Sequence, residues 1–197
     1  MRVTLFDYGA GNLHSLSKAL STVPGVDVRV EEDPRRAVDT EVLVLPGVGA
    51  FGAAAARLSP GLDVMRTALE GGLPCLGICL GMQLLFDSSE EGPGQGVGHF
   101  AGRVTRLNAR RVPQMGWNSV DADRTVSGST MAMAYYAHSF VCRAEDSSVV
   151  TAWTTHEGDR FPAAVRRGSV VGVQFHPEKS SSQGVAFIQG FLREVSS

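Results

Sequence analysis

The stretch Leu73–Phe86, which reads LPCLGICLGMQLLF, constrains the fold of this chain more than any other. It begins as an apolar run with the length of a buried strand and continues from Met82 as a helix. Between them, Cys79 is flanked at a distance of two residues by Gly77 and Gly81. Glycines at this spacing favour a tight strand-to-helix turn, since larger side chains would collide with it, and the central residue is held in a strained conformation. The pattern predicts a cysteine nucleophile elbow.

An elbow of this kind would place the sulfur of Cys79 at the N-terminal end of a helix. The helix dipole and the free backbone N–H groups favour a thiolate there. The alternative interpretation is a small buried cysteine in a glycine-rich turn. The three cysteines of the chain are odd in number and lack metal-ligand spacing, which indicates reduced thiols and no metal site. We expect Cys75, in the strand before the elbow, to serve packing.

Length and composition predict a single domain over residues 1–197. A hydrophobic content of 43% is enough for a sizeable core, and a net charge of −2 gives no basic footprint for nucleic acid. The N-terminus enters a strand at once, without a secretory signal, and no apolar run approaches the length of a membrane helix. We therefore expect a cytoplasmic protein that binds neither nucleic acid nor membranes.

Strands and helices alternate through the first half of the chain. Strand-like runs over Arg2–Phe6, Val26–Val30 and Val42–Leu45 are separated by helical stretches. This order predicts an α/β fold with a central, mostly parallel sheet and helices on both faces. Short β-prone runs in the second half predict a mixed or antiparallel extension. An apolar strand, Val170–Phe175, and a helix from about Ser182 to Val195 close the chain.

A base for the sulfur is expected at the same edge of the sheet, since sites in such folds form at the carboxyl ends of the strands. His176 directly follows the last strand, and Glu178 stands two residues on. A cysteine nucleophile needs a base to take its proton and a group to orient that base. His176 and Glu178 fit these roles, whereas the alternative for this segment is a loop with a surface glutamate.

Acyl transfer also needs hydrogen-bond donors for the oxyanion. One candidate is the N–H of Leu80, immediately after the nucleophile. The second is a peptide of the glycine-rich loop Pro46–Gly49, which follows a buried strand. With these donors, the residues predict acyl transfer through a thioester.

The residues alone leave two features open. Trp117 stands between Gly116 and Asn118, where a tryptophan belongs either to the core or to a contact surface, because it is costly to leave in water. The adjacent acids Glu90 and Glu91 are typical of a solvated surface.

The chain resembles the class I, triad-type glutamine amidotransferases in the segments YGAGN, LPGVGAFG, GICLGMQLLF, EEG, VPQMGWN, YYAHSF and GVQFHPEKS. Within that class, PGVGAFG, PQMGWN and HPEKS make it similar to the glutamine amidotransferase subunits of imidazole glycerol phosphate synthase. The resemblance spans nearly the whole chain. It implies a flavodoxin-like fold and a glutaminase activity.

In the implied reaction, Cys79 attacks the side-chain amide of L-glutamine and ammonia leaves. Water then hydrolyses the glutamyl thioester to glutamate. The resemblance makes His176 general base and then acid, oriented by Glu178. It matches Val48 and Gly49 to the loop whose peptide must reorient to complete the oxyanion hole. The positions that the family uses for the amino-acid end of glutamine are Gln83, Glu91, Ser139 and Phe140.

The family also implies a partner. It is a (β/α)8-barrel cyclase subunit that forms a heterodimer and receives ammonia through a dry passage. The cyclase makes imidazole glycerol phosphate and aminoimidazole carboxamide ribonucleotide in histidine biosynthesis. Interface positions matched in this chain are Asn12, Trp117, Asn118, Tyr135 and Lys179. The resemblance therefore favours a contact role for Trp117, and it implies no cofactor and no metal.

Three other interpretations remain at this stage. The chain would serve an anthranilate or aminodeoxychorismate synthase, act as a γ-glutamyl hydrolase, or be a non-catalytic regulatory scaffold. PQMGWN and HPEKS weigh against the first, and the Cys79, His176 and Glu178 set weighs against the last.

Overall fold

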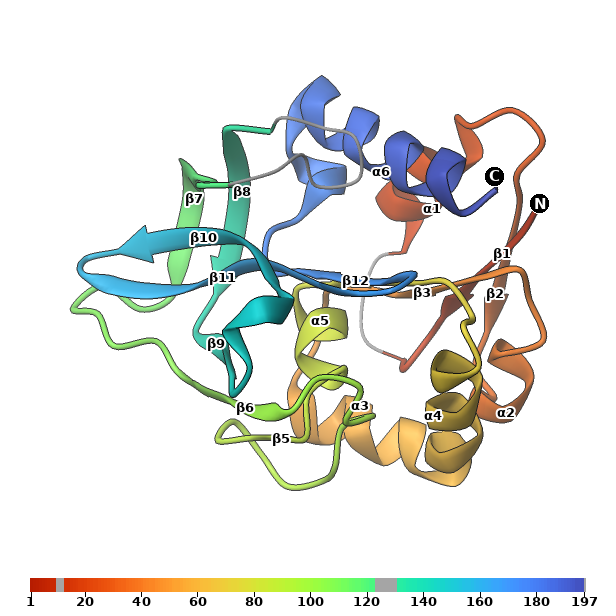
Figure 1. Cartoon of the computed structure of the whole chain (residues 1–197), viewed down its shortest axis with the longest axis horizontal. Coiled ribbons are helices and arrows are strands. Elements are labelled where there is room, and N and C mark those ends of the chain that lie inside the picture. Colours follow the sequence, from red (N-terminus) through yellow and green to blue (C-terminus); the bar gives the residue numbers. More distant parts are fainter. Residues whose placement is uncertain (10–12, 123–130, 197) are drawn as a thin grey trace.

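The computed structural model describes residues 1–9, 13–122 and 131–196. Its centre is a seven-stranded sheet in the order β10-β11-β12-β4-β3-β1-β2 (Figure 1). The parallel strands are β1 (Arg2–Phe6), β2 (Asp27–Glu31), β3 (Val42–Leu45), β4 (Cys75–Ile78) and β12 (Val170–Val173). Beyond β12, the antiparallel strands β11 (Asp159–Arg167) and β10 (Val150–His156) extend the sheet. The predicted fold class is confirmed.

Helices cover both faces of this sheet (Figure 1). One face carries α1 (His14–Ser21) and α6 (Ser181–Val195). The other carries α2 (Pro34–Ala37), α3 (Phe51–Leu58), α4 (Leu62–Glu70) and α5 (Leu80–Leu84). Strand β3 is apolar throughout because alternate side chains enter opposite cores: Val42 and Val44 pack under α1 and α6, and Leu43 and Leu45 pack against α3 to α5.

Two smaller sheets complete the fold at the end of the main sheet that carries β10 and β11 (Figure 1). One consists of β5 (Ser88–Ser89), β6 (Gly102–Arg106) and β9 (Phe140–Ala144), and the other of β7 (Gln114–Ser119) and β8 (Met133–His138). Short 3₁₀ helices are η1 (Ser59–Gly61), η2 (Ser147–Val149) and η3 (Pro177–Lys179). Trp117 therefore lies in a strand, antiparallel to β8.

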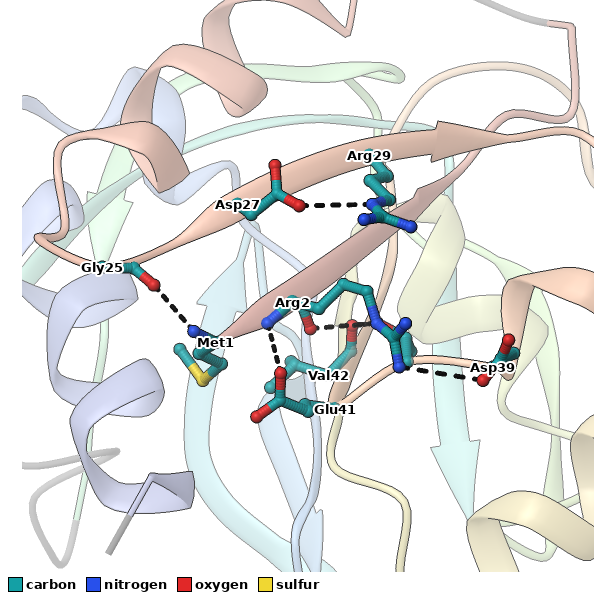
Figure 2. A network of polar contacts seen from close by, with 9 residues as sticks. Met1, Arg2, Gly25, Asp27, Arg29, Asp39, Glu41 and Val42 are labelled. Atoms are coloured by element: carbon teal, nitrogen blue, oxygen red, sulfur yellow. Dashed lines mark hydrogen bonds and ion pairs between the residues drawn. The ribbon is translucent and has the colours of Figure 1, made fainter.

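The amino ends of the parallel strands are held by polar contacts (Figure 2). The Met1 ammonium donates to the Gly25 carbonyl at 2.7 Å, and the Arg2 N–H donates to Glu41 Oε2 at 2.6 Å. The Arg2 guanidinium lies 3.7 Å from the Asp39 carboxylate. These contacts fix the start of β1 between its neighbours, at the opposite edge from the carboxyl ends of the strands.

Candidate active site

The nucleophile elbow has the geometry that its sequence predicts. Cys79 sits between β4 and α5 with φ 47° and ψ −103°, a conformation that few residues other than glycine adopt. A Cβ added to Gly81 would lie 2.0 Å from the Leu45 carbonyl oxygen, and one added to Gly77 would lie 2.7 Å from the Gly81 carbonyl oxygen. Both glycines are therefore required by the close approach of backbone to backbone. The Cys79 N–H donates to Val173 O at 2.7 Å, which joins the elbow to β12.

The adjacent strand brings the imidazole to the sulfur. β12 lies parallel to β4, with Val173 opposite Ile78, and the chain reaches His176 three residues later. The His176 side chain lies close enough to Cys79 for the thiol to shift the pKa of the imidazole, and its Nδ1 lies 2.8 Å from Glu178 Oε1. Imidazole and carboxylate are both almost fully buried. The three side chains form a Cys–His–Glu array.

Charge at this array favours a protonated imidazole. Burial lowers the pKa of His176, but hydrogen bonds with Cys79 and Glu178, together with their negative charges, raise it to about 10. An imidazolium at neutral pH is the natural counter-ion for a thiolate and can later protonate a leaving amine.

A cleft of about 380 Å³ opens over the array. Cys79 and His176 line it, whereas Glu178 does not and is joined to Nδ1 of the imidazole. Predicted site residues that line it are Val48, Gly49, Cys79, Leu80, Gln83, Glu91, Ser139, Phe140, His176 and Lys179. Residues separated by more than a hundred positions in the sequence thus meet around one space.

The glycine-rich loop after β3 runs against the nucleophile. A Cβ at Gly47 would lie 3.1 Å from Cys79 Cβ and 3.0 Å from His176 Cε1, so only glycine passes here without displacement. Gly49 has φ +118°, which glycine adopts without strain. The loop and the start of α5 at Leu80 border the cleft on the side of the sulfur.

The predicted glutamine-binding residues also line the cleft. Gln83 is buried and its Nε2 donates to the Phe140 carbonyl at 2.9 Å. Glu91 Oε2 accepts from the Phe51 N–H, the first residue of α3, at 2.8 Å. The Ser139 carbonyl accepts from the Leu107 N–H at 2.9 Å. Glu91 is therefore a fixed group of the cleft wall, and its interpretation as a solvated surface acid is wrong.

The predicted interface residues gather on β7, β8 and η3. Trp117 and Tyr135 make an edge-to-face contact at 6.3 Å, and Lys179 Nζ lies 6.0 Å from the centre of the Tyr135 ring. Asn118 Nδ2 donates to the Thr155 carbonyl at 3.0 Å, which holds β7 to β10. Trp117 is 52% exposed, so the core alternative for it is wrong. Asn12 lies outside the described residues.

Two buried polar residues of the site were not assigned from the sequence. His138, in β8, lines the cleft, and its pKa is lowered to about 3 by burial, by His156 and by His176. Gln174 is fully buried, and its Nε2 donates to Cys79 Sγ at 3.5 Å. Their signals were present, since both stand in the segments YYAHSF and GVQFHPEKS, but only the fold shows what they contact.

Comparison with known proteins assigns the class. The family "Glutamine amidotransferase class-I" matches residues 4–195. The chain therefore belongs to the class-I glutamine amidotransferases. Its fold is similar to a crystal structure of a glutamine amidotransferase, with a TM-score of 0.75 at 20% identity over 99% of both chains. It is also similar to the crystal structure of a glutamine amidotransferase from Thermotoga maritima, with a TM-score of 0.65 at 17% identity over 100% of this chain and 84% of that one.

Curated relatives narrow the class. Subunit HisH of imidazole glycerol phosphate synthase from Symbiobacterium thermophilum is 42% identical over 98% of this chain and 94% of the relative. The same subunit from Thermosynechococcus vestitus is 38% identical over 98% and 97%, and that from Pyrococcus furiosus is 38% identical over 98% of both. Within the class, the chain belongs to the HisH family. This membership weighs against the chorismate-using and γ-glutamyl hydrolase interpretations.

Proposed function

We propose that this chain is the glutaminase subunit of an imidazole glycerol phosphate synthase, hydrolysing L-glutamine to L-glutamate and ammonia. The observation that carries the proposal is the elbow itself. A cysteine in a strained turn shares a cleft with a buried imidazole, and Nδ1 of that imidazole lies 2.8 Å from a carboxylate. A non-catalytic scaffold would have no use for this strain and burial.

The proposed reaction has two stages. Cys79 transfers its proton to His176 and attacks the amide carbon of glutamine, forming a C–S bond. The C–N bond then breaks as His176 returns the proton to the leaving ammonia. In the second stage His176 deprotonates a water that attacks the thioester, so that glutamate leaves and the thiol is restored. Glu178 orients the imidazole and stabilises its charged form.

Peptide N–H groups are proposed to hold the oxyanion. The first belongs to Leu80, at the start of α5, and the second to the Val48–Gly49 peptide, after the loop reorients. The contact of Gly47 with Cys79 and His176 supports this, because it keeps the loop beside the reacting atoms.

The amino-acid end of glutamine is proposed to bind at Gln83, Glu91 and the backbone of Ser139 and Phe140. A zwitterionic ligand needs an acceptor for its ammonium, and Glu91 supplies a carboxylate inside the cleft. Its tie to the Phe51 N–H supports a fixed orientation before substrate binds.

We infer that the partner is a (β/α)8-barrel cyclase subunit that docks on the β7–β8 face and takes up the ammonia. Exposed Met115 and Trp117, with Tyr135 and Lys179, form an aromatic and apolar rim of the kind enriched at interfaces. Met115 and Lys179 also line the cleft, so a partner seated here would cover its mouth. Ammonia passed on under such a cover avoids protonation by bulk water.

We infer further that residues 1–197 form one amidotransferase domain that works in the cytoplasm without a metal or cofactor. The family match over nearly the whole chain supports the single domain. Across the described residues, every helix is too short or too polar to cross a membrane.

The test is ammonia release measured with and without the cyclase subunit. We expect the isolated chain to be nearly silent, because the partner sets the oxyanion peptide, and the complex to turn over glutamine. Cys79→Ala should abolish turnover in the complex while leaving the protein folded. Equal rates with and without the cyclase would end the claim of partner dependence, and full turnover by Cys79→Ala would end the assignment.

A further inference from the structure

A buried amide contacts the nucleophile from a side that the triad does not use. Gln174 follows β12 and is 0% exposed. Its Nε2 donates to Cys79 Sγ at 3.5 Å, a normal length for an N–H···S hydrogen bond. Gln174 does not border the cleft, so it reaches the sulfur from within the core and not from the substrate space.

Its orientation is fixed by a second amide. Gln83 Nε2 donates to the Phe140 carbonyl at 2.9 Å and to Gln174 Oε1 at 3.5 Å. An amide that accepts at its oxygen must present its N–H₂ group elsewhere, and here it presents it to Cys79. Flipping Gln174 would set its N–H₂ against that of Gln83 and its carbonyl oxygen against the sulfur.

The backbone holds the pair in register. The Gln174 N–H donates to the Ala163 carbonyl at 2.9 Å, and the neighbouring Val173 carbonyl accepts from the Cys79 N–H at 2.7 Å. Since both ends of the contact are tied to the central sheet, the amide is pre-organised toward the sulfur before any charge forms there.

The other groups near the sulfur do not replace this donor. His176, backed by Glu178, supplies the positive charge on the cleft side. Burial raises the pKa of Tyr8 and of Cys142, which keeps both groups neutral, and the Tyr8 hydroxyl donates to the Pro46 carbonyl and not to the sulfur. The Ala137 carbonyl lies 3.9 Å from Sγ and as an acceptor favours the thiol.

We propose that Gln174 is a positioning residue that stabilises the Cys79 thiolate through its side-chain N–H and keeps the sulfur facing the imidazole. The proposal rests on the proposed function, in which that sulfur is the nucleophile. The proton balance is simple: Cys79 gives its proton to His176, and the amide donates a hydrogen bond to the resulting anion without transferring a proton.

The test is the pH dependence of Cys79 alkylation by iodoacetamide in the isolated chain, with the adduct quantified by mass spectrometry. Gln174→Met keeps the length of the side chain and removes the donor. In this variant we expect the midpoint of the alkylation rate against pH to rise by about one pH unit, which corresponds to the loss of one hydrogen bond to a charged group. Cys75 and Cys142 are fully buried and should stay unlabelled in the folded protein.

Gln114→Met is the matched control, since Gln114 is a buried glutamine of β7 that lies outside the cleft. This variant should leave the midpoint of the alkylation profile unchanged. Circular dichroism checks folding, and Gln174→Leu replaces Gln174→Met if the latter does not fold. A folded variant with the wild-type midpoint would overturn the proposal.

A kinetic readout in the complex separates positioning from substrate contact. Gln174→Met should lower kcat for glutamine about tenfold, as expected for a less stable thiolate, with KM changed less than about twofold. A rise in KM with kcat unchanged would also overturn the proposal. Failure of the wild-type complex to release ammonia would count against the proposed function alone, because the alkylation profile needs no turnover.

Discussion

The two ends of the parallel strands use polar groups in opposite ways. At the carboxyl ends, the site groups are nearly all buried: His176 is 2% exposed and Gln174 is 0% exposed. At the amino ends, the ion pairs of Figure 2 lie in solvent, with the Asp39 side chain 87% exposed. Buried polar groups without partners are expensive, whereas exposed ones are resolvated. The site groups are therefore constrained by their burial, and we expect the opposite edge to tolerate substitution better.

The backbone follows the same contrast. At the carboxyl edge Cys79 holds a strained conformation and Gly81 touches the Leu45 carbonyl. At the amino edge Gly25 also has a positive φ, +78°, but no atom lies within 4 Å of a Cβ placed there. The turn at Gly25 requires only a positive φ. The elbow requires a positive φ at Cys79 and, at Gly81, room for the close approach of another backbone segment. Substitutions at the two edges should therefore have very different effects.

The largest effect is expected from Glu178→Gln. The amide keeps the shape of the side chain but removes the negative charge that stabilises the imidazolium, so kcat of the complex should fall by about 1,000-fold. Ammonia release at saturating glutamine measures it. Glu32→Gln, at a side chain that is 70% exposed and pairs with Arg57, serves as the control and should change kcat by less than about twofold. Similar losses in both variants would contradict the role given to Glu178.

A pair of glycine substitutions compares the two edges directly. Gly81→Ala should destabilise the fold by about 3 kcal/mol or more, because the new methyl meets backbone that cannot move away. Gly25→Ala should cost only about 1 kcal/mol, for the positive φ alone. Urea unfolding of the two variants gives both values. Equal losses of unfolding free energy in the two variants would contradict the close backbone contact at Gly81.

Much of this contrast was readable from the sequence, because its causes are local. The spacing of Gly77, Cys79 and Gly81 predicted the elbow, and the position of His176 after an apolar strand predicted the base. Other contacts between distant segments could not be predicted. Gln174 meets Cys79, and Glu91 meets the start of α3, only because the fold joins them.

The two buried histidines of the cleft predict a stability maximum near pH 6.5. The pKa of His176 is raised to about 10, so the folded state binds more protons and its stabilisation is lost as pH rises from 6.5 to 10. The pKa of His138 is lowered to about 3, so its neutral folded form costs stability as pH falls from 6.5 toward 3. On each side of pH 6.5, the free energy of unfolding should change by up to about 1.4 kcal/mol per pH unit.

Denaturant unfolding across pH 4–9 would measure these slopes at constant ionic strength. His176→Ala should flatten the alkaline side and leave the acid side in place. His138→Phe should reduce the slope on the acid side alone, and His99, whose pKa is also lowered by burial, should keep part of that slope. A slope between pH 6.5 and about 8 that survives in His176→Ala would show that another group causes it; nearer pH 9 the buried Cys75 and Cys142 thiols, whose pKa values are raised by burial, add a slope of their own.

The smallest effect is expected at the amino edge. Arg29 and Asp27 form a 3.2 Å ion pair with both side chains at least 60% exposed (Figure 2). Arg29→Ala should therefore change the free energy of unfolding by less than about 0.5 kcal/mol. A loss of unfolding free energy above about 1.5 kcal/mol would show that substitutions at the amino edge are as destabilising as those at the site.

The most direct test of the elbow mechanism is to trap the acyl-enzyme. The complex with the cyclase subunit is mixed with glutamine, quenched in acid during turnover and digested for mass spectrometry. A glutamyl thioester on the peptide that carries Cys79, with none on Cys75 or Cys142, is the predicted result. Turnover of glutamine with no adduct on Cys79, or an adduct that persists after Cys79→Ala, would contradict it.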